Sequence, residues 1–222
     1  MWTDLAAHAV THVYLAGSAL VLALAAGIPL GIASAVFRPV RSPALALAGI
    51  GRTLPSLAVL MLLLPLLGVG SAPAIVALAL LAAPPILIAV DAGIRGVPSA
   101  ALDAAAGMGM RPVQTFRRVV APLAMPVAFS GVRTAATETI ASATLATFVG
   151  AGGLGDLIVR GMQTGDTASL FEGAATVAPM VLALGLALMA AGVATNAAFI
   201  VVGAVILISG LGLWIAQLVP GR

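Results

Sequence analysis

The sequence of 222 residues contains no cysteine and no lysine. Without cysteine it has no disulfide, no thiolate nucleophile and no Cys-ligated metal site. Without lysine it cannot build the phosphate-binding loop of ATPases, in which a Lys that follows the glycines reaches the β- and γ-phosphates. Any ATP-driven process that involves this chain therefore needs another subunit to hydrolyse the nucleotide.

Charged and aromatic residues are also scarce, at 8% and 4% of the chain, whereas 62% is hydrophobic. Soluble domains carry roughly 25% charged residues. With a mean hydropathy of +1.20, this chain has too little polar surface to coat a soluble globule, and we expect an integral membrane protein. The net charge of +3 would suit nucleic acid. Because the arginines are dispersed beside membrane-length segments, we expect the lipid bilayer and no nucleic acid as partner.

Six apolar segments are long enough to cross a bilayer, which takes about 20 residues per helix. They are residues 13–37, 44–68, 72–90, 122–147, 173–195 and 197–218. The sequence thus predicts an all-α, polytopic transmembrane bundle of about five to six spans, forming a single domain over residues 1–222. Prolines inside the spans predict kinks, because neighbouring helices can satisfy the carbonyls that a proline frees. These prolines are Pro29, Pro55, Pro65, Pro84 and Pro85.

The arginines indicate the orientation. Six of them lie in the 38–43 loop and in the polar segment 91–121, namely Arg38, Arg41, Arg95, Arg111, Arg117 and Arg118. The segments on the opposite side hold only Arg160. Since cytoplasmic loops carry the excess of positive charge, we expect the 91–121 loop inside and the N-terminus and the Gly-rich loop 148–172 outside. The N-terminal stretch has no basic start and is not expected to be a cleavable signal peptide.

The 91–121 loop predicts two short helices. Ser99 is a good N-cap for the Ala-rich stretch 100–106, and Pro112 fits the first turn of a second helix over 112–121. Apolar side chains of this second helix share one face: Val113, Phe116 and Val120. Such a helix pair either docks in a groove of another protein or lies on anionic lipid headgroups.

From Asp103 the loop continues as DAAAGMGMRPVQTFRRVVAPLAMP. It resembles the loop of ABC importer permeases that work with a binding protein, which runs Glu-Ala-Ala, three residues, Gly, and later a hydrophobic residue and Pro. The spacing of Asp103, Gly109 and Pro122 matches, whereas Asp103 replaces the usual Glu and Ala121 the usual bulky residue. By this resemblance the residues that couple to an ATPase subunit are Asp103, Ala104, Ala105, Gly109, Arg117 and Pro122.

Further stretches resemble the subgroup that imports quaternary amines such as glycine betaine, choline or carnitine. They are GIPLGI at 27–32, GRTLPSLAVLMLLLPLLGVGSAPAIVALAL from Gly51, and SGVRTAATETIASATLATFVGAGGLGDLI from Ser130. The T-x-P-S-L-A run at 53–58 and the GAGGLGDLI run at 150–158 are the more specific features. Methionine and phosphonate importers share the Gly-rich run in looser form. Beyond about residue 195 the resemblance fades.

The resemblance implies a multi-pass permease subunit of the type I ABC importer kind in the bacterial inner membrane, without enzymatic activity of its own. Its implied partners are a second permease copy or paralogue, cytoplasmic ABC ATPase subunits that hold ATP and Mg²⁺, and an extracytoplasmic substrate-binding protein. A quaternary ammonium group is usually held in an aromatic cage. Because this chain has few aromatic residues, it is expected to be a poor receptor for such a group, which agrees with capture by a separate binding protein. The alternatives are an importer of another small solute such as methionine, a stand-alone secondary transporter, or a scaffold, which would not need the ordered loop.

Polar residues inside the spans are candidates for a pathway or gate. A charged side chain in a span usually faces the bundle interior or water, although Arg52 could instead snorkel to an interface. Glu138 is expected to pair with Arg133 or with a facing helix. The candidate pathway or gate residues are Arg52, Thr53, Pro55, Ser56, Arg133, Glu138, Gly152 and Gly153.

The glycines of the external loop are expected to form a gate or re-entrant turn that faces the binding protein, since a phosphate cradle would need a lysine. Asp156 and Asp166 in this loop either contact basic groups of that partner or are ordinary solvated acids. His8 and His12 have a spacing that suits a metal ion, but without a third ligand we expect interfacial histidines and no metal site. Gly27 and Gly31 permit close helix packing, but carry little weight among 25 glycines.

Overall fold

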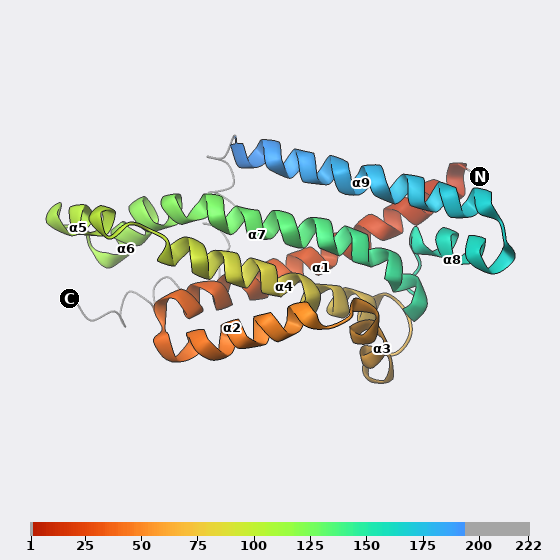
Figure 1. Cartoon of the computed structure of the whole chain (residues 1–222), viewed down its shortest axis with the longest axis horizontal. Helices are drawn as coiled ribbons and strands as arrows, with labels where there is room; N and C mark the ends of the chain where they lie inside the picture. Colours follow the sequence, from red (N-terminus) through yellow and green to blue (C-terminus); the bar gives the residue numbers. More distant parts are fainter. Residues whose placement is uncertain (1, 194–222) are drawn as a thin grey trace.

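The computed structural model describes residues 2–193, and three long helices form the centre of this part of the chain. These are α1 (Trp2–Val36), α4 (Ser71–Arg95) and α7 (Ala121–Ser142), which run along the long axis of the molecule (Figure 1). Small and branched apolar side chains fill the space between them: Ala23, Ile28 and Ile32 from α1, Ala82, Ile86 and Val90 from α4, and Ala135 from α7. The all-α prediction is confirmed.

Four helical stretches in the described part are long and apolar enough to cross a membrane, and a bent helix pair makes a fifth. The four are Leu5–Val36, Ser71–Arg95, Pro112–Val149 and Thr167–Leu188. They confirm the predicted spans at 13–37, 72–90 and 122–147 and the described part of 173–195. The predicted span at 197–218 lies outside the described residues.

The predicted span over 44–68 is present but bent, and the kink expected at Pro55 is a break between two helices. This segment forms α2 (Arg38–Thr53) and α3 (Ser56–Leu67), which meet at an angle of 102°. Pro55 causes the break, because a proline pushes the preceding residue into the extended region, and Leu54 has φ −72° and ψ 131°. The other prolines expected to kink the spans lie inside continuous helices.

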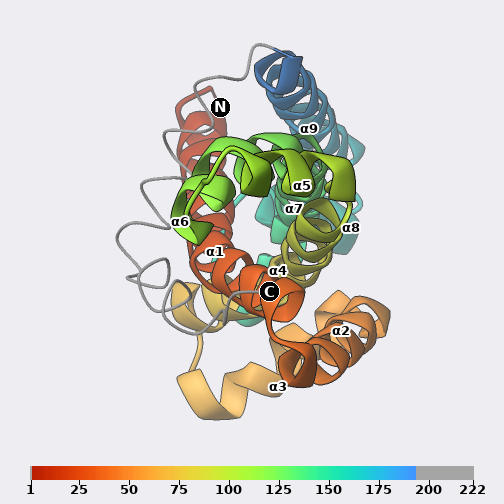
Figure 2. The same cartoon turned by 90° about the vertical axis from the view of Figure 1, so that its left-hand side faces the viewer.

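The two Arg-rich segments lie at the same end of the molecule, as the orientation argument requires. The turn between α1 and α2 and the segment after α4 share one end, whereas the N-terminus, α3 and α8 (Gly155–Thr164) share the other (Figure 1). In Figure 2, α9 (Thr167–Val193) lies on one flank of the central helices and α2 and α3 on the opposite flank. By the positive-inside rule, we expect the Arg-rich end to be cytoplasmic.

The polar segment is shorter than its predicted 91–121 range, because α4 continues to Arg95. It forms α5 (Ser99–Gly107) and α6 (Pro112–Thr115), which lie across the end of the bundle (Figure 2). The expected separate helix 112–121 is not separate, since a π-helical turn, η1 (Phe116–Val120), joins α6 to α7 without a break. Pro98, not Ser99, occupies the N-cap position of α5.

Glycines allow the central helices to approach one another closely. A Cβ on Gly31 would lie 2.7 Å from the Val90 Cβ, and one on Gly27 would lie 3.0 Å from the Ala83 carbonyl oxygen. These contacts join α1 to α4, so the Gly27–Gly31 pair matters more than its sequence suggested. In a bilayer, where lipid is as apolar as leucine, such close packing is a main source of helix association.

Candidate functional site

The loop at the Arg-rich end presents Asp103 and Ala104 to solvent, while Ala105 on the same helix is fully buried. Gly109 has φ +70°, in the left-handed region. Its N–H donates to the Ala106 carbonyl at 2.9 Å, and the Met110 N–H donates to the Ala105 carbonyl at 3.1 Å. This pair of hydrogen bonds is the Schellman motif, which ends a helix with glycine in the left-handed conformation. Gly109 thus fixes the angle at which the chain leaves α5.

The exposed apolar side chains of this loop differ from those that the sequence predicted. Val113 is 39% exposed, but Phe116 and Val120 are partly buried. The apolar side chains exposed beside Asp103 are instead Leu102 and Met108, and Met108 is 67% exposed. Arg117 is exposed and Pro122 is partly buried at the start of α7. Sequence reasoning missed Met108, whose exposure follows from its position just before the turn at Gly109.

A polar cluster that the sequence did not predict lies at the C-terminal end of α4. The Asp91 carboxylate is 4% exposed and accepts a hydrogen bond of 2.8 Å from the Ser34 hydroxyl of α1. The Nε atoms of Arg41 on α2 and Arg95 on α4 each lie 3.8 Å from it. Because Asp91 directly follows an apolar run, sequence reasoning placed it in the polar loop. In the structure it joins three helices.

We expect Asp91→Asn to lower the stability of the protein, because it removes the charge that Arg41 and Arg95 face. A hydrogen bond to a charged group contributes about 1.5–3 kcal/mol. The arginine side chains are 38% and 43% exposed and can turn to solvent, so we expect a loss near the lower end of that range. Thermal unfolding of the purified protein in detergent measures the effect. The exposed Asp103→Asn variant is the control, and equal stability of the two variants would contradict a structural role for Asp91.

The candidate pathway residues divide between two regions. Arg52, Thr53 and Pro55 are exposed and Ser56 is partly buried at the bend between α2 and α3. At about 1.5 Å per residue, Arg52 lies roughly 21 Å from the start of α2, most of the way across a bilayer. In the described part of the chain α2 packs mainly on α1 and α4, and α3 on α4, so this group does not share one site with the α7 residues Arg133 and Glu138.

Arg133 and Glu138 are both exposed on α7. The expected ion pair between them does not form, and neither has another ionic partner in the described part of the chain. They form a polar stripe along α7 with Ser130, Thr134 and Thr137. Since a charged side chain at membrane depth usually faces a bundle interior or water, we expect this side of α7 to face water or another protein.

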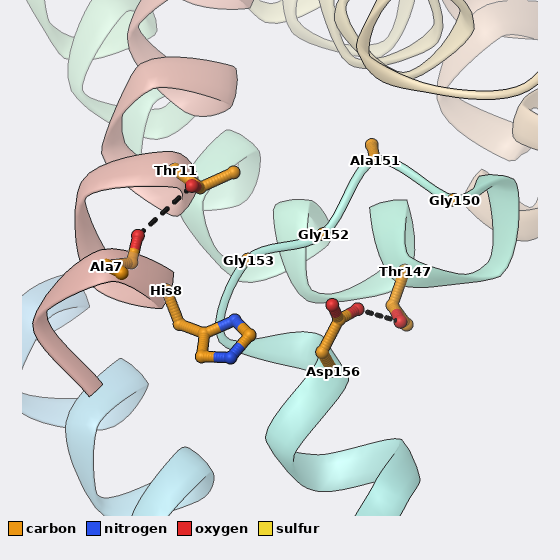
Figure 3. A pocket seen from close by; sticks show the side chains of 9 residues that line it. All are labelled: Ala7, His8, Thr11, Thr147, Gly150, Ala151, Gly152, Gly153 and Asp156. Carbon is orange, nitrogen blue, oxygen red and sulfur yellow. Dashed lines mark hydrogen bonds between the residues drawn. The ribbon is translucent and has the colours of Figure 1, made fainter. Parts of the chain in front are cut away.

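At the opposite end of the molecule, α1 and the Gly-rich loop line an open pocket of about 540 Å³. Gly152 and Gly153 border it, with φ of +81° and +97°. Figure 3 shows its lining residues, which are Ala7, His8, Thr11, Thr147, Gly150, Ala151, Gly152, Gly153 and Asp156. The Thr147 hydroxyl donates to the Asp156 Oδ1 atom. The loop is followed by α8 rather than by a long flexible segment.

His12, which was expected at the membrane interface, is fully buried between helices and does not face the surface of the bundle. Its Nε2 atom lies 2.9 Å from the Ile140 carbonyl oxygen, which can only accept, so Nε2 carries the proton. A Cβ on Gly153 would lie 3.3 Å from its Nδ1 atom, so Gly153 leaves room for this ring. No group of three or more metal-ligating acids, histidines or cysteines occurs in residues that the structure describes.

Asp166 lies between α8 and α9 and is the N-cap of α9. Its carboxylate accepts hydrogen bonds from the Ser169 hydroxyl at 2.6 Å and from the Ala168 N–H at 3.0 Å. The Ser169 hydrogen bond is the main cause that lowers the pKa of Asp166 below its usual value. Asp166 therefore has a structural role, whereas Asp156 faces the pocket.

Comparison with known proteins gives consistent results. Residues 27–219 match the family described as "Binding-protein-dependent transport system inner membrane component". This match continues beyond residue 195, where the sequence resemblance was expected to fade. Choline transport system permease protein OpuBB of Bacillus subtilis (strain 168) is 38% identical over 81% of this chain and 83% of that protein. Glycine betaine/carnitine/choline transport system permease protein OpuCB of the same organism is 40% identical over 75% of this chain and 76% of that protein.

Among solved structures, an inward-facing form of the MetNI methionine ABC transporter aligns with a TM-score of 0.72. The alignment covers 92% of this chain and 97% of that chain, at 24% sequence identity. At this identity the similarity shows the fold alone. The fold is that of a type I ABC importer permease, as expected.

Proposed function

The chain belongs to the family of binding-protein-dependent transport system inner membrane components, and from this membership we propose that it is the permease subunit of an ATP-driven importer of quaternary amines. The observation that carries the substrate class is the identity of 38% and 40% to permeases named for choline, glycine betaine and carnitine transport. In this proposal the protein lies in the bacterial inner membrane, and a separate extracytoplasmic binding protein captures the amine.

Cytoplasmic ATPase subunits supply the energy, with ATP and Mg²⁺ bound to them. The loop around Asp103 and Gly109 is the proposed contact, supported by its exposed apolar side chains Leu102 and Met108. The π-helical turn η1 links this loop to the span α7. A displacement of the loop by ATP-driven closure of the ATPases is therefore transmitted directly into a membrane-spanning helix. An ATPase partner can shift the permease between outward-open and inward-open states only if it binds the two states with different affinities.

The polar stripe of α7 is the proposed wall of the pathway. Arg133 and Glu138 have no ionic partner in the described part of the chain, and charged side chains at membrane depth rarely face lipid. A second permease copy or paralogue opposite α7 would cover the stripe and leave a polar passage between the two subunits. The region around Arg52 and Ser56 is proposed as a separate part of the same passage, next to the bend between α2 and α3.

Uptake measurements test the proposal. The chain is produced with its ATPase and binding-protein subunits in a bacterial strain that lacks its own uptake of these amines. We expect import of radiolabelled choline, glycine betaine or carnitine that depends on both partners. Cells without the binding-protein gene are the control.

Import of methionine without any of the three amines would replace the proposed substrate class. Uptake that continues when the ATPase gene is absent would instead indicate a stand-alone secondary transporter.

A further inference from the structure

The external pocket between α1 and the Gly-rich loop has a chemistry that the passage of a quaternary amine does not explain. We propose that it receives a lysine or arginine side chain of the extracytoplasmic binding protein and thereby fixes that protein on the permease. This inference rests on the proposed function, because it assumes that such a binding protein docks at this end.

The pocket carries a fixed negative charge on Asp156. Thr147 donates a hydrogen bond to its Oδ1 atom, and Asp156 lies in the first turn of α8, where the helix dipole stabilises a carboxylate. Its Oδ2 atom lies on the side of Gly152, at 3.7 Å from where a Cβ on that glycine would be. No cation from the described part of the chain forms an ion pair with Asp156, and Arg160, one turn further along α8, is exposed.

The other polar groups of the pocket can also accept hydrogen bonds. The Thr11 hydroxyl already donates to the Ala7 carbonyl at 3.1 Å, so its oxygen is left as an acceptor. The His8 ring lies on the opposite side of the pocket from Asp156 (Figure 3), and the two side chains form no ion pair. A neutral imidazole accepts a hydrogen bond through only one ring nitrogen. The acceptors that favour a positive, hydrogen-bond-donating group are therefore Asp156 and Thr11.

This chemistry distinguishes between two kinds of cation. Ammonium and guanidinium groups carry N–H donors that fit the carboxylate and the hydroxyl. A quaternary ammonium group has no N–H and is usually recognised by aromatic faces, and no aromatic residue lines this pocket apart from the His8 imidazole. The pocket therefore fits a lysine or arginine side chain better than it fits the proposed substrate.

The backbone keeps the pocket accessible. Gly150, Gly152 and Gly153 all have positive φ, so the loop turns around the pocket without side chains that would fill it. Ala7 and Gly150 are exposed, and the pocket lies at the end opposite to α5 and α6 (Figure 1). By the arginine asymmetry this end is outside, where a binding protein delivers its ligand.

The test uses the complete transporter, with its ATPase subunits, in lipid nanodiscs. Purified ligand-loaded binding protein of the same transporter is titrated, and the stimulated ATPase rate is measured. For Asp156→Asn we expect the half-saturating concentration of binding protein to rise about tenfold with an unchanged maximal rate, because a lost charge contact weakens docking. The half-saturating concentration of binding protein should also depend less on salt concentration in this variant. Asp156→Arg should raise the half-saturating concentration further, because it repels a cationic side chain.

Asp166→Asn is the matched control, because it makes the same charge change in the same external loop but outside the pocket. Asparagine also caps helices well, so this variant should behave as the unaltered protein does. If Asp156→Asn and Asp166→Asn give the same half-saturation within twofold, the inference is wrong. A lower maximal rate with unchanged half-saturation would assign the pocket to the substrate and would also overturn it.

Two further outcomes are informative. Loss of permease pairing in Asp156→Asn before binding protein is added would mean that a second permease copy occupies the pocket, which contradicts the inference. If the unaltered transporter does not respond to any binding protein, the proposed function itself fails. If the unaltered transporter and Asp156→Asn both respond normally to binding protein, only the inference about the pocket is wrong and the proposed function stands.

Discussion

Replacement of Gly109 by valine is expected to abolish uptake while the protein still inserts into the membrane. Gly109 has φ +70°, and an L-residue other than glycine in this region costs roughly 1–2 kcal/mol. The turn would relieve this strain by leaving the Schellman geometry, which would change the direction of the chain after α5. Since Asp103 and Met108 precede this turn and α6 follows it, the proposed ATPase contact would lose its shape. We expect an uptake rate at least about tenfold lower.

Gly107→Val is the matched control. Gly107 is the last residue of α5, has no neighbouring atom within 4 Å of an added Cβ, and has no positive φ. It therefore accepts a side chain without backbone strain in the same exposed loop. Uptake is measured in cells, insertion by the amount of protein in the membrane fraction, and contact with the ATPase by co-purification. Equal uptake by the two variants would show that the conformation of Gly109 does not matter for coupling.

Apolar length and arginine asymmetry were sufficient to predict the general architecture. Apolar runs of 19 or more residues can be satisfied in a bilayer only as helices, and the segments 13–37, 72–90 and 122–147 indeed form α1, α4 and α7. The arginine distribution predicted correctly that the 38–43 loop and the loop after α4 lie at one end. Both predictions rest on properties summed over many residues, namely hydropathy and positive charge, so a single unusual residue does not change them.

The local exceptions depend on contacts between distant residues, and these the sequence does not contain. Hydropathy alone could not place Asp91 inside the bundle, because its Ser34 partner lies 57 residues earlier in the chain. The sequence could not show that His12 is buried, because its partner, the Ile140 carbonyl, is 128 residues away. Pro55 is similar, since prolines inside membrane helices are common and only one of the five forms a break.

The coupling residues were predicted from their order in the loop, and the structure shows why one of them, Gly109, is a glycine. Gly109 is needed because of its left-handed conformation in the Schellman motif. The roles of Asp103 and Arg117 stay predictions, since both are exposed and their proposed partner belongs to another chain. The role of Asp156 was predicted only in part from the sequence. Its loop was identified from the glycines, but its orientation toward a pocket depends on Thr147 and on the start of α8.

Glycine packing between α4 and α7 gives the largest expected effect on stability. A Cβ on Gly131 would lie 2.6 Å from the Pro85 carbonyl oxygen and closer still to the Ala89 Cβ. On the same pair of helices, a Cβ on Gly93 would lie 2.6 Å from the Ala124 carbonyl oxygen. These neighbours are backbone atoms or a short side chain on a rigid helix, so they cannot move aside. A side chain at Gly131 must therefore push α4 and α7 apart along the central interface.

We expect Gly131→Leu to destabilise the protein by at least about 3 kcal/mol, at the upper end of the usual cost of overpacking. Thermal unfolding of the purified protein in detergent measures the change. Gly17→Leu is the control, because Gly17 lies inside α1 and an added Cβ there meets no atom within 4 Å. Both variants gain the same helix propensity, worth up to about 1 kcal/mol, so their difference isolates the contact. If the two proteins unfold at the same temperature, the close approach of α4 and α7 does not hold the bundle together.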